Sequence, residues 1–159
     1  MTTPTPEQRL QALAINLPDV INPIGNFRNA KRIGDLIYVS GQGPVTADGQ
    51  YLKGKVGAEV TALEAQAHAK LVAINILAVL KAELGELSKI TGVVKLLGMV
   101  NAIPQFEQHP TVINGCSDFL CQILGDAGPH ARSALGVGSL PNNITVEIEA
   151  IVSVKPEGA

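Results

Sequence analysis

The segment Gly128–Val154 constrains the fold most strongly, because it is predicted to form two β-strands joined by a turn. The first strand is expected over Ala131–Val137 and the second over Ile144–Val154. Between them, Leu140–Asn143 has turn chemistry, since proline presets φ and asparagine tolerates left-handed backbone. Alternate residues of a strand share a face, so the character of each face can be predicted.

The charged residues of this segment all fall on one predicted face. The apolar face of the second strand holds Val146, Ile148, Ala150 and Val152, and its other face holds Glu147, Glu149 and Ile151. On the first strand, Leu135 and Val137 share the face suited to a core, and Arg132 lies opposite with Ala134 and Gly136. We therefore expect Arg132 and the two glutamates to share one face, and the chemistry to lie there.

Two long helices are predicted upstream. Thr61–Glu64 is a capping box that opens a helix over Ala62–Leu84, and Gly85 ends it. The expected core stripe of this helix is Leu63, Ala67, Leu71, Ile74, Ala78 and Leu84. The second helix follows Pro110 and ends at Gly125. Its predicted inner face is Val112, Cys116, Phe119, Leu120 and Ile123, and its outer face is Asn114, Asp118 and Gln122.

The remaining elements are shorter. A helix is expected to start at Thr5–Pro6 and to end before Pro18, and a hairpin is expected from Phe27–Arg32 and Leu36–Ser40. A further strand is predicted over Gly92–Val100. The stretch Gly41–Val60 is either a functional loop or a decorated hairpin with a short edge strand. Of the other polar residues, His68 and His109 are expected to be solvated, and Asn75 to be a satisfied polar residue near the sheet.

This order of elements predicts an α+β two-layer sandwich in which two long helices cover one face of a mixed sheet. The other face is uncovered and semi-apolar, with Ile151 and Met99 expected beside Lys95, Glu147 and Arg132. Because a monomer rarely leaves such a surface wet, we expect an oligomer with the site between subunits. The chain is interpreted as one domain, residues 1–159, with an N-terminal extension over 1–22 and a core over 23–154.

Composition narrows the classes of function. The 159 residues carry a formal net charge of −2 and no basic cluster, which argues against nucleic acid. Cys116 and Cys121 are five apart on a predicted helix and diverge by about 140°, so neither a local disulfide nor a metal site is indicated. The sequence has no apolar signal region, and its longest apolar run, Leu71–Leu80, is interrupted by Asn75. We expect a cytoplasmic protein without a membrane span.

Three motifs in order carry a family resemblance: Leu36–Gln42, His130–Ala134, and Leu140–Pro141 followed by Val146–Ala150. Together they resemble the Rid family, the reactive intermediate deaminases, also called YjgF proteins or endoribonuclease L-PSP. The resemblance extends from Pro23 to Val154 and points to a longer, divergent branch. It implies a chorismate-mutase-like α+β sandwich assembled as a homotrimer with three clefts between subunits.

The resemblance also implies an activity that uses no cofactor or metal: hydrolysis of reactive enamines and imines, such as 2-aminoacrylate, to a 2-keto acid and ammonia. Arg132 matches the arginine that binds the substrate carboxylate, and Glu147 matches the glutamate that handles the attacking water. Ser40 and Gly41 match residues that line the pocket, and Asn114 matches the helix asparagine near the substrate. Two further pocket positions depart from the family, since Phe27 and Ala134 stand where it has tyrosine and cysteine.

Other interpretations stay open at this point. Arg132 could form a structural ion pair with Glu147 or Glu149, and His130, two residues before it, could be purely structural. The chain could bind a small carboxylate metabolite without catalysis. A ribonuclease, the activity in many family labels, is disfavoured by the acidic charge.

Overall fold

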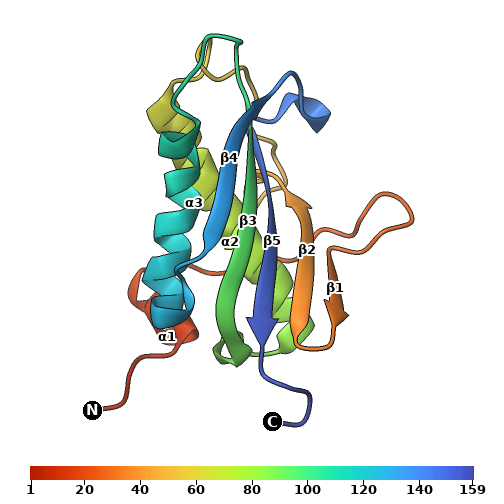
Figure 1. The fold of residues 1–159 in the computed structure, drawn as a ribbon, viewed down its shortest axis with the longest axis vertical. Coiled ribbons are helices and arrows are strands. Elements are labelled where there is room, and N and C mark those ends of the chain that lie inside the picture. The colour runs from red at the N-terminus through yellow and green to blue at the C-terminus, as the bar shows by residue number, and fades with distance from the viewer.

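A computed structural model describes residues 1–159 and contains one five-stranded sheet in the order β1-β2-β5-β3-β4 (Figure 1). The strands are β1 Ala30–Ile33, β2 Leu36–Gln42, β3 Ile90–Asn101, β4 Ala131–Val137 and β5 Val146–Val154. Neighbouring strands are antiparallel except β3 and β4, which are parallel. Parallel neighbours need a crossover connection, and the second long helix supplies it.

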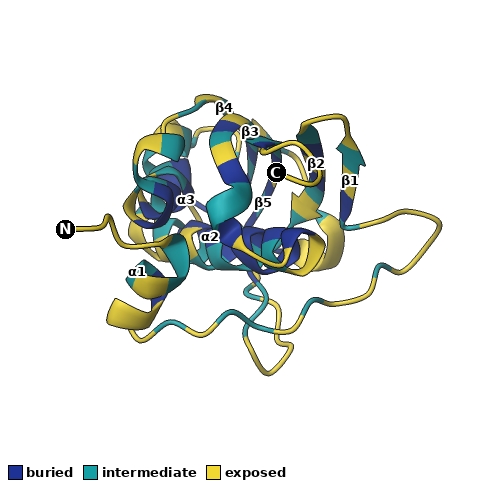
Figure 2. Ribbon diagram, turned by 90° about the horizontal axis from the view of Figure 1, so that it is seen from below, coloured by how far each residue is buried: buried dark blue, intermediate teal, exposed yellow.

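The helices are α1 Pro6–Ala12, α2 Ala62–Leu84 and α3 His109–Leu124, with short 3₁₀ turns at Leu87–Lys89, Gly125–Ala127 and Pro141–Asn143. Figure 1 shows α2 behind the sheet and α3 beside β4. Seen from below in Figure 2, the buried residues gather between this helical layer and the sheet. The predicted two-layer α+β sandwich with a mixed sheet is therefore confirmed, and its fold is the chorismate-mutase-like one that the resemblance implied.

The boundaries of α2 follow the predicted signals. The Thr61 hydroxyl accepts a hydrogen bond from the Glu64 backbone N–H at 3.1 Å, and the Glu64 carboxylate accepts one from the Thr61 N–H at 2.7 Å. Gly85 ends the helix with φ of 79°, a backbone conformation that glycine adopts without a steric penalty. The helix is long and apolar enough to cross a membrane by composition, but half of that window is buried inside the fold. We describe α2 as a core helix.

The predicted core stripe of α2 is wrong over its first four residues, whereas its last two, Ala78 and Leu84, are buried as expected. Leu63 is 71% exposed, Ala67 is exposed, and Leu71 and Ile74 are only partly buried. The buried face is instead Ala65, Ala69, Val72, Ala73, Ile76, Leu77 and Leu80. Small alanines let α2 approach its neighbours closely, and Gly115 of α3 lies directly against the Gln66 backbone carbonyl. Close packing therefore selected the alanine face over the leucine face.

The predicted faces of β5 are confirmed. Its buried residues are Val146, Ile148, Ala150 and Val152, which lie toward the helices. On the uncovered face, Glu147 is paired with Met99 and Ile151 with Lys95 of β3. This face is thus semi-apolar, as the alternation of β5 predicted.

The predicted faces of β4 are wrong. Arg132 pairs with Leu96, a fully buried core residue, so its side chain lies on the helix side of the sheet. Ala134 packs against the core on that side, and Leu135 is exposed on the uncovered side. The reason is the close approach of α3: a Cβ added to Gly136 would lie 2.5 Å from the His109 ring nitrogen. The strand carries its small residues toward the helix for that reason.

The N-terminal extension and the loop after β2 both pack on the helices. Arg9 of α1 donates a hydrogen bond from Nη1 to the Ile123 carbonyl at 2.9 Å. Between β2 and α2, Val45 and Tyr51 pair around the Asp48–Gly49 turn, so this part of the loop is a small decorated hairpin. The predicted satisfied role of Asn75 is confirmed, because its amide donates to the Gly43 and Val45 carbonyls at 3.0 and 3.1 Å.

Two histidines differ from the expectation of solvation. His68 is half-buried in α2, and its Nδ1 lies 2.8 Å from the Thr145 hydroxyl. Desolvation lowers its pKa, although the charge of Glu64 opposes the shift. His109 lies edge-on to the Phe106 ring, with ring centroids 5.2 Å apart. Both rings therefore belong to the packing where α2, α3 and the sheet meet.

Candidate functional site

The seven residues expected at the site fall into two groups on opposite faces of the sheet. On the helix side, at the β4 edge, are Arg132, Asn114 and Ala134. On the uncovered side and its margin are Phe27, Ser40, Gly41 and Glu147. The expectation that Arg132 and Glu147 share a face of one sheet is therefore wrong for a single chain.

Side chains and carbonyls of α3 hold the Arg132 guanidinium. Nη1 donates to the Ser117 hydroxyl at 3.0 Å, and Nη2 donates to the Asn114 side-chain oxygen at 2.8 Å. A longer contact of 3.4 Å joins Nη2 to the Pro110 carbonyl. The ion pairs of the chain involve Arg32 and Lys81, so Arg132 pairs with neither Glu147 nor Glu149 within the chain.

A guanidinium has five N–H donors, and three of those on Arg132 are engaged by neutral oxygens. Nε–H and one Nη1–H have no partner in the chain, and the long contact from Nη2–H to the Pro110 carbonyl can be exchanged for a hydrogen bond to an anion. Arg132 and Asn114, both expected at the pocket, are joined by this hydrogen bond of 2.8 Å. This edge can therefore present a positive charge, with fixed orientation, to a carboxylate.

Ser117 and His130 also belong to this group. The His130 Nε2 lies 2.9 Å from the Ser117 hydroxyl, and its Nδ1 lies 2.7 Å from the Gly128 carbonyl. Ser117 is three residues after Asn114, and residues three apart share a helix face. That spacing was a usable sequence signal, which the choice of Asn114, Asp118 and Gln122 as the outer face overlooked.

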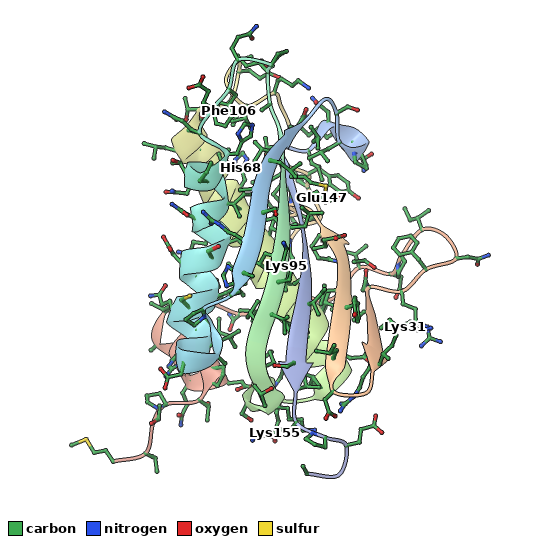
Figure 3. All side chains as sticks on the ribbon, viewed as in Figure 1. Lys31, His68, Lys95, Phe106, Glu147 and Lys155 are labelled. Atoms are coloured by element: carbon green, nitrogen blue, oxygen red, sulfur yellow. The ribbon has the colours of Figure 1, made fainter.

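On the other side of the sheet, Glu147 lies against Gly41. A Cβ added to Gly41 would be 2.8 Å from the Glu147 carboxyl carbon, so a larger residue there would displace the carboxylate. The pairing of β2 with β5 is irregular between Val39 and Gln42, where the register shifts. Figure 3 labels Glu147 near the N-terminal end of β5, which follows the turn after β4. The shifted register thus places a glycine where the carboxylate needs room.

The environment of Glu147 favours its protonated form. Burial raises the pKa of this half-buried carboxyl group, and the negative charge of Glu149 on the same face raises it further. A pKa moved toward neutrality suits a group that takes up and returns a proton near physiological pH. The site therefore holds a candidate general base.

Phe27 and Ser40 line a hollow of about 780 Å³ on the uncovered face. Tyr38, Lys95 and Glu149 line the same hollow, and the Phe27 side chain is 55% exposed. The Ser40 hydroxyl donates to the Arg28 carbonyl at 2.6 Å, which fixes the backbone before Gly41. Phe27 therefore gives this hollow an apolar wall.

Neither cysteine is suited to nucleophilic chemistry. Both are free thiols. Burial raises the pKa of Cys116 to about 12, although nearby Arg132 opposes the shift. Burial also raises the pKa of Cys121, with Asp118 adding to it. Because the thiolate is the reactive form, neither cysteine is expected to act as a nucleophile near neutral pH.

Known proteins resemble this chain along most of its length. Residues 7–151 match the family described as "YjgF/chorismate_mutase-like, putative endoribonuclease". Protein TCP17 of Trypanosoma cruzi is 38% identical over 146 residues, which are 91% of this chain and 91% of that protein. The crystal structure of Atu1372 from Agrobacterium tumefaciens, described as of unknown function, has 43% identity and a TM-score of 0.87 over 95% of this chain and 94% of its own.

A more distant structure adds a ligand. E. coli TdcF was solved with bound serine, and it has 23% identity and a TM-score of 0.60 over 86% of this chain and 94% of its own. At this identity the likeness concerns the fold. TdcF, which shares this fold, therefore binds a small amino acid.

Proposed function

The chain belongs to the YjgF/chorismate mutase-like family, and on that basis we propose that it hydrolyses reactive enamines and imines to 2-keto acids and ammonia. The substrates are small carboxylates of the 2-aminoacrylate kind. The reaction takes place in a cleft between subunits of a homotrimer. We place this activity in the cytoplasm, where the two free thiols stay reduced.

The observation that carries the proposal is the state of Arg132. Neutral oxygens of Asn114, Ser117 and Pro110 orient its guanidinium, and no carboxylate of the chain neutralises it. A substrate carboxylate that takes Nε–H together with Nη2–H replaces the long contact to Pro110. A planar fork of this kind suits the carboxylate of a 2-imino acid.

The chemistry requires a proton acceptor beside the imine carbon, and Glu147 supplies it. The enamine first tautomerises to the imine. Glu147 then takes a proton from water as the water oxygen bonds to the imine carbon, and it passes this proton to the imine nitrogen, which restores the carboxylate. When the C–N bond of the resulting carbinolamine breaks, the hydroxyl becomes the keto group, and its proton leaves with the nitrogen as ammonia.

Two subunits are needed for this arrangement, because Arg132 and Glu147 lie on opposite faces of the same sheet. A neighbouring subunit that packs on the uncovered face brings its own β4 edge beside Glu147. The semi-apolar character of that face, with Met99 and Ile151 near the acidic residues, supports such packing. The proposed cleft thus takes arginine from one chain and glutamate from the next.

A binding function without turnover is the second candidate. The observation that favours it is Ala134, which packs against the core and offers no polar group beside Arg132. The exposed ring of Phe27 likewise adds no hydroxyl to its hollow. In this case Arg132 would bind a carboxylate metabolite as a sensor.

An interception assay tests the first function. An amino acid oxidase generates imines from a panel of amino acids, and semicarbazide traps whatever imine has not been hydrolysed. We expect the protein to lower semicarbazone formation and Glu147→Gln to abolish that effect while pyruvate binding remains. Pyruvate binding without any turnover would establish the sensor instead. If the protein neither binds pyruvate nor hydrolyses any imine, both functions are excluded.

Calorimetric titration with pyruvate tests Arg132 directly. Two charge-assisted hydrogen bonds contribute about 1.5–3 kcal/mol each, so Arg132→Ala is expected to weaken binding by roughly a hundredfold or more. Arg132→Lys should restore part of the affinity, because it keeps the charge and loses the fork. Thermal melts provide the control: a much lower melting temperature for Arg132→Ala, with no pyruvate binding by the unaltered protein, would mean that Arg132 is structural.

A further inference from the structure

Behind Arg132, a chain of hydrogen bonds leads from the guanidinium through Ser117 and His130 to the turn before β4. It begins at the Gly128 carbonyl, which lies 2.7 Å from Nδ1 of His130. It continues from Nε2 of the same ring to the Ser117 hydroxyl at 2.9 Å, and from that hydroxyl to Nη1 of Arg132 at 3.0 Å. Three elements therefore meet at the guanidinium: the turn before β4, β4 itself and α3.

The chemistry of the partners fixes the direction of each bond in this chain. A carbonyl oxygen only accepts, so Nδ1 of His130 carries the ring proton. In the neutral ring Nε2 then accepts, and the Ser117 hydroxyl donates its proton to it. A guanidinium only donates, so Arg132 donates to one of the two lone pairs of the Ser117 oxygen. Every donor in the chain has one acceptor, and the last donor is the arginine.

We infer that Ser117 and His130 are positioning residues that hold the Arg132 guanidinium in the orientation that binds the substrate carboxylate. This inference rests on the proposed function and deepens it. A long arginine side chain has many rotamers, and fixing one before the ligand arrives raises affinity. Asn114 fixes Nη2 at 2.8 Å, and the chain through Ser117 fixes Nη1. With both nitrogens held, the remaining N–H groups keep a constant direction.

The backbone supports this role. Gly128 lies so close to the Cys121 backbone of α3 that a Cβ at this position would overlap it. The turn before β4 is therefore held against α3, and the Gly128 carbonyl has a fixed place. His130 is half-buried between that carbonyl and Ser117, so its ring cannot turn away without losing both hydrogen bonds.

A hydroxyl 2.9 Å from an imidazole also resembles a nucleophile with its base. The hydrogen bond from Arg132 opposes that role, because it takes one of the two lone pairs of the Ser117 oxygen and its positive charge makes that oxygen less nucleophilic. A nucleophilic oxygen needs a lone pair directed at the substrate. The geometry thus indicates that Ser117 orients Arg132 and does not act as a nucleophile. Labelling of Ser117 by a sulfonyl fluoride would overturn the inference.

A double-mutant cycle on the whole protein tests the inference, with pyruvate as the titrated probe. Ser117→Ala is expected to raise Kd for pyruvate about tenfold, the value of one hydrogen bond to a charged group. Ser117→Thr, which keeps the hydroxyl, should restore affinity. In imine hydrolysis the same loss should appear in KM, with kcat within about twofold, because Glu147 carries the proton transfer. In the Arg132→Ala background, Ser117→Ala should have no further effect.

His130→Phe keeps a ring and removes both nitrogens. Its effect should be smaller than that of Ser117→Ala and should vanish when Ser117 is already alanine, because the ring acts through the hydroxyl. Nitrogen NMR of His130 should place the ring proton on Nδ1. A proton on Nε2, an unchanged Kd in Ser117→Ala, or additive losses in the cycle would each overturn the inference and leave the proposed function intact. Failure of the unaltered protein to bind pyruvate or hydrolyse imines would overturn the proposed function, and the inference with it.

Discussion

Glu147 and Glu149 share the uncovered face of β5, and their separation by one residue matters for the proposed catalysis. Burial and the neighbouring charge both raise the pKa of Glu147. As a general base, Glu147 acts only when it has lost its proton, so kcat/KM is expected to rise with pH through this raised value. The acid limb of the profile therefore reports the environment of one carboxyl group.

Glu149→Gln is predicted to move that acid limb to lower pH, because it removes the negative charge that helps keep the Glu147 proton in place. The measurement is kcat/KM for imine hydrolysis against pH, with Glu86→Gln as a control at a distant exposed carboxylate. A limb that stays in place after Glu149→Gln would assign the base to a group other than Glu147.

The raised pKa of Glu147 also affects folding stability. Its contribution to stability falls as pH rises, whereas the expected kcat/KM increases. The folded chain binds the Glu147 proton more tightly than the unfolded chain does. The contribution of this group to stability is therefore lost as pH rises from the ordinary carboxyl pKa through the raised one. Glu147 is thus a residue whose chemical role costs stability at neutral pH, and Glu147→Gln is expected to melt no lower than the unaltered protein there.

At the scale of elements, α2 shows what hydrophobic periodicity can and cannot determine. Its ends followed from Thr61, Glu64 and Gly85, because capping is local chemistry. Its core face followed only in part, at Ala78 and Leu84, because the helix is apolar on more than one side. The choice between faces depended on how near the sheet and α3 come, which is a tertiary property. Alanine is the residue that permits close approach, although a hydropathy pattern ranks leucine above it.

Paired substitutions test this assignment. Ala69→Leu, at a fully buried position, is predicted to lower the free energy of unfolding by about 1–3 kcal/mol through overpacking. Ala67→Leu, two residues earlier on the exposed side, should change it by less than about 0.5 kcal/mol. Melts are compared at one protein concentration, since assembly also contributes to stability. Equal losses in both variants would mean that Ala67 is packed against another chain.

The strands β4 and β5 show the same limit. Strict alternation in β5 placed Glu147 correctly, because each even-numbered residue is apolar and the face is unambiguous. In β4, the two larger apolar residues, Leu135 and Val137, were predicted to face the core. They lie instead on the uncovered face of the sheet. The edge strand is packed by a helix that leaves room only for small groups. The position of Arg132 was therefore unpredictable from alternation, and its proposed role comes from the family resemblance of the motif around it.

At the scale of the whole molecule, the two half-sites make a specific demand on assembly. One face of the sheet carries Glu147, and the helix side of the β4 edge carries Arg132. If each cleft joins one chain's glutamate to the next chain's arginine, two inactive variants can complement each other. Such complementation distinguishes a site shared between two subunits from a site formed within one chain.

We predict that Arg132→Ala and Glu147→Gln chains, unfolded together and refolded as mixed trimers, recover about one quarter of the normal activity by random assortment. Each variant refolded alone should be inactive. The measurement is imine hydrolysis at equal total chain concentration, with sedimentation to verify that mixed trimers form. Inactive mixed trimers would show that arginine and glutamate must come from the same chain.

The opposite faces of Arg132 and Glu147 also have a genetic consequence. In the proposed trimer, every chain contributes to two clefts, once through each face, so a chain altered at both residues spoils the two clefts it enters. A cell with one intact and one doubly altered allele, expressed equally, would keep about one quarter of its clefts instead of one half. Loss of function at this locus would then be partly dominant, and deletion of the gene would be milder than its doubly altered allele.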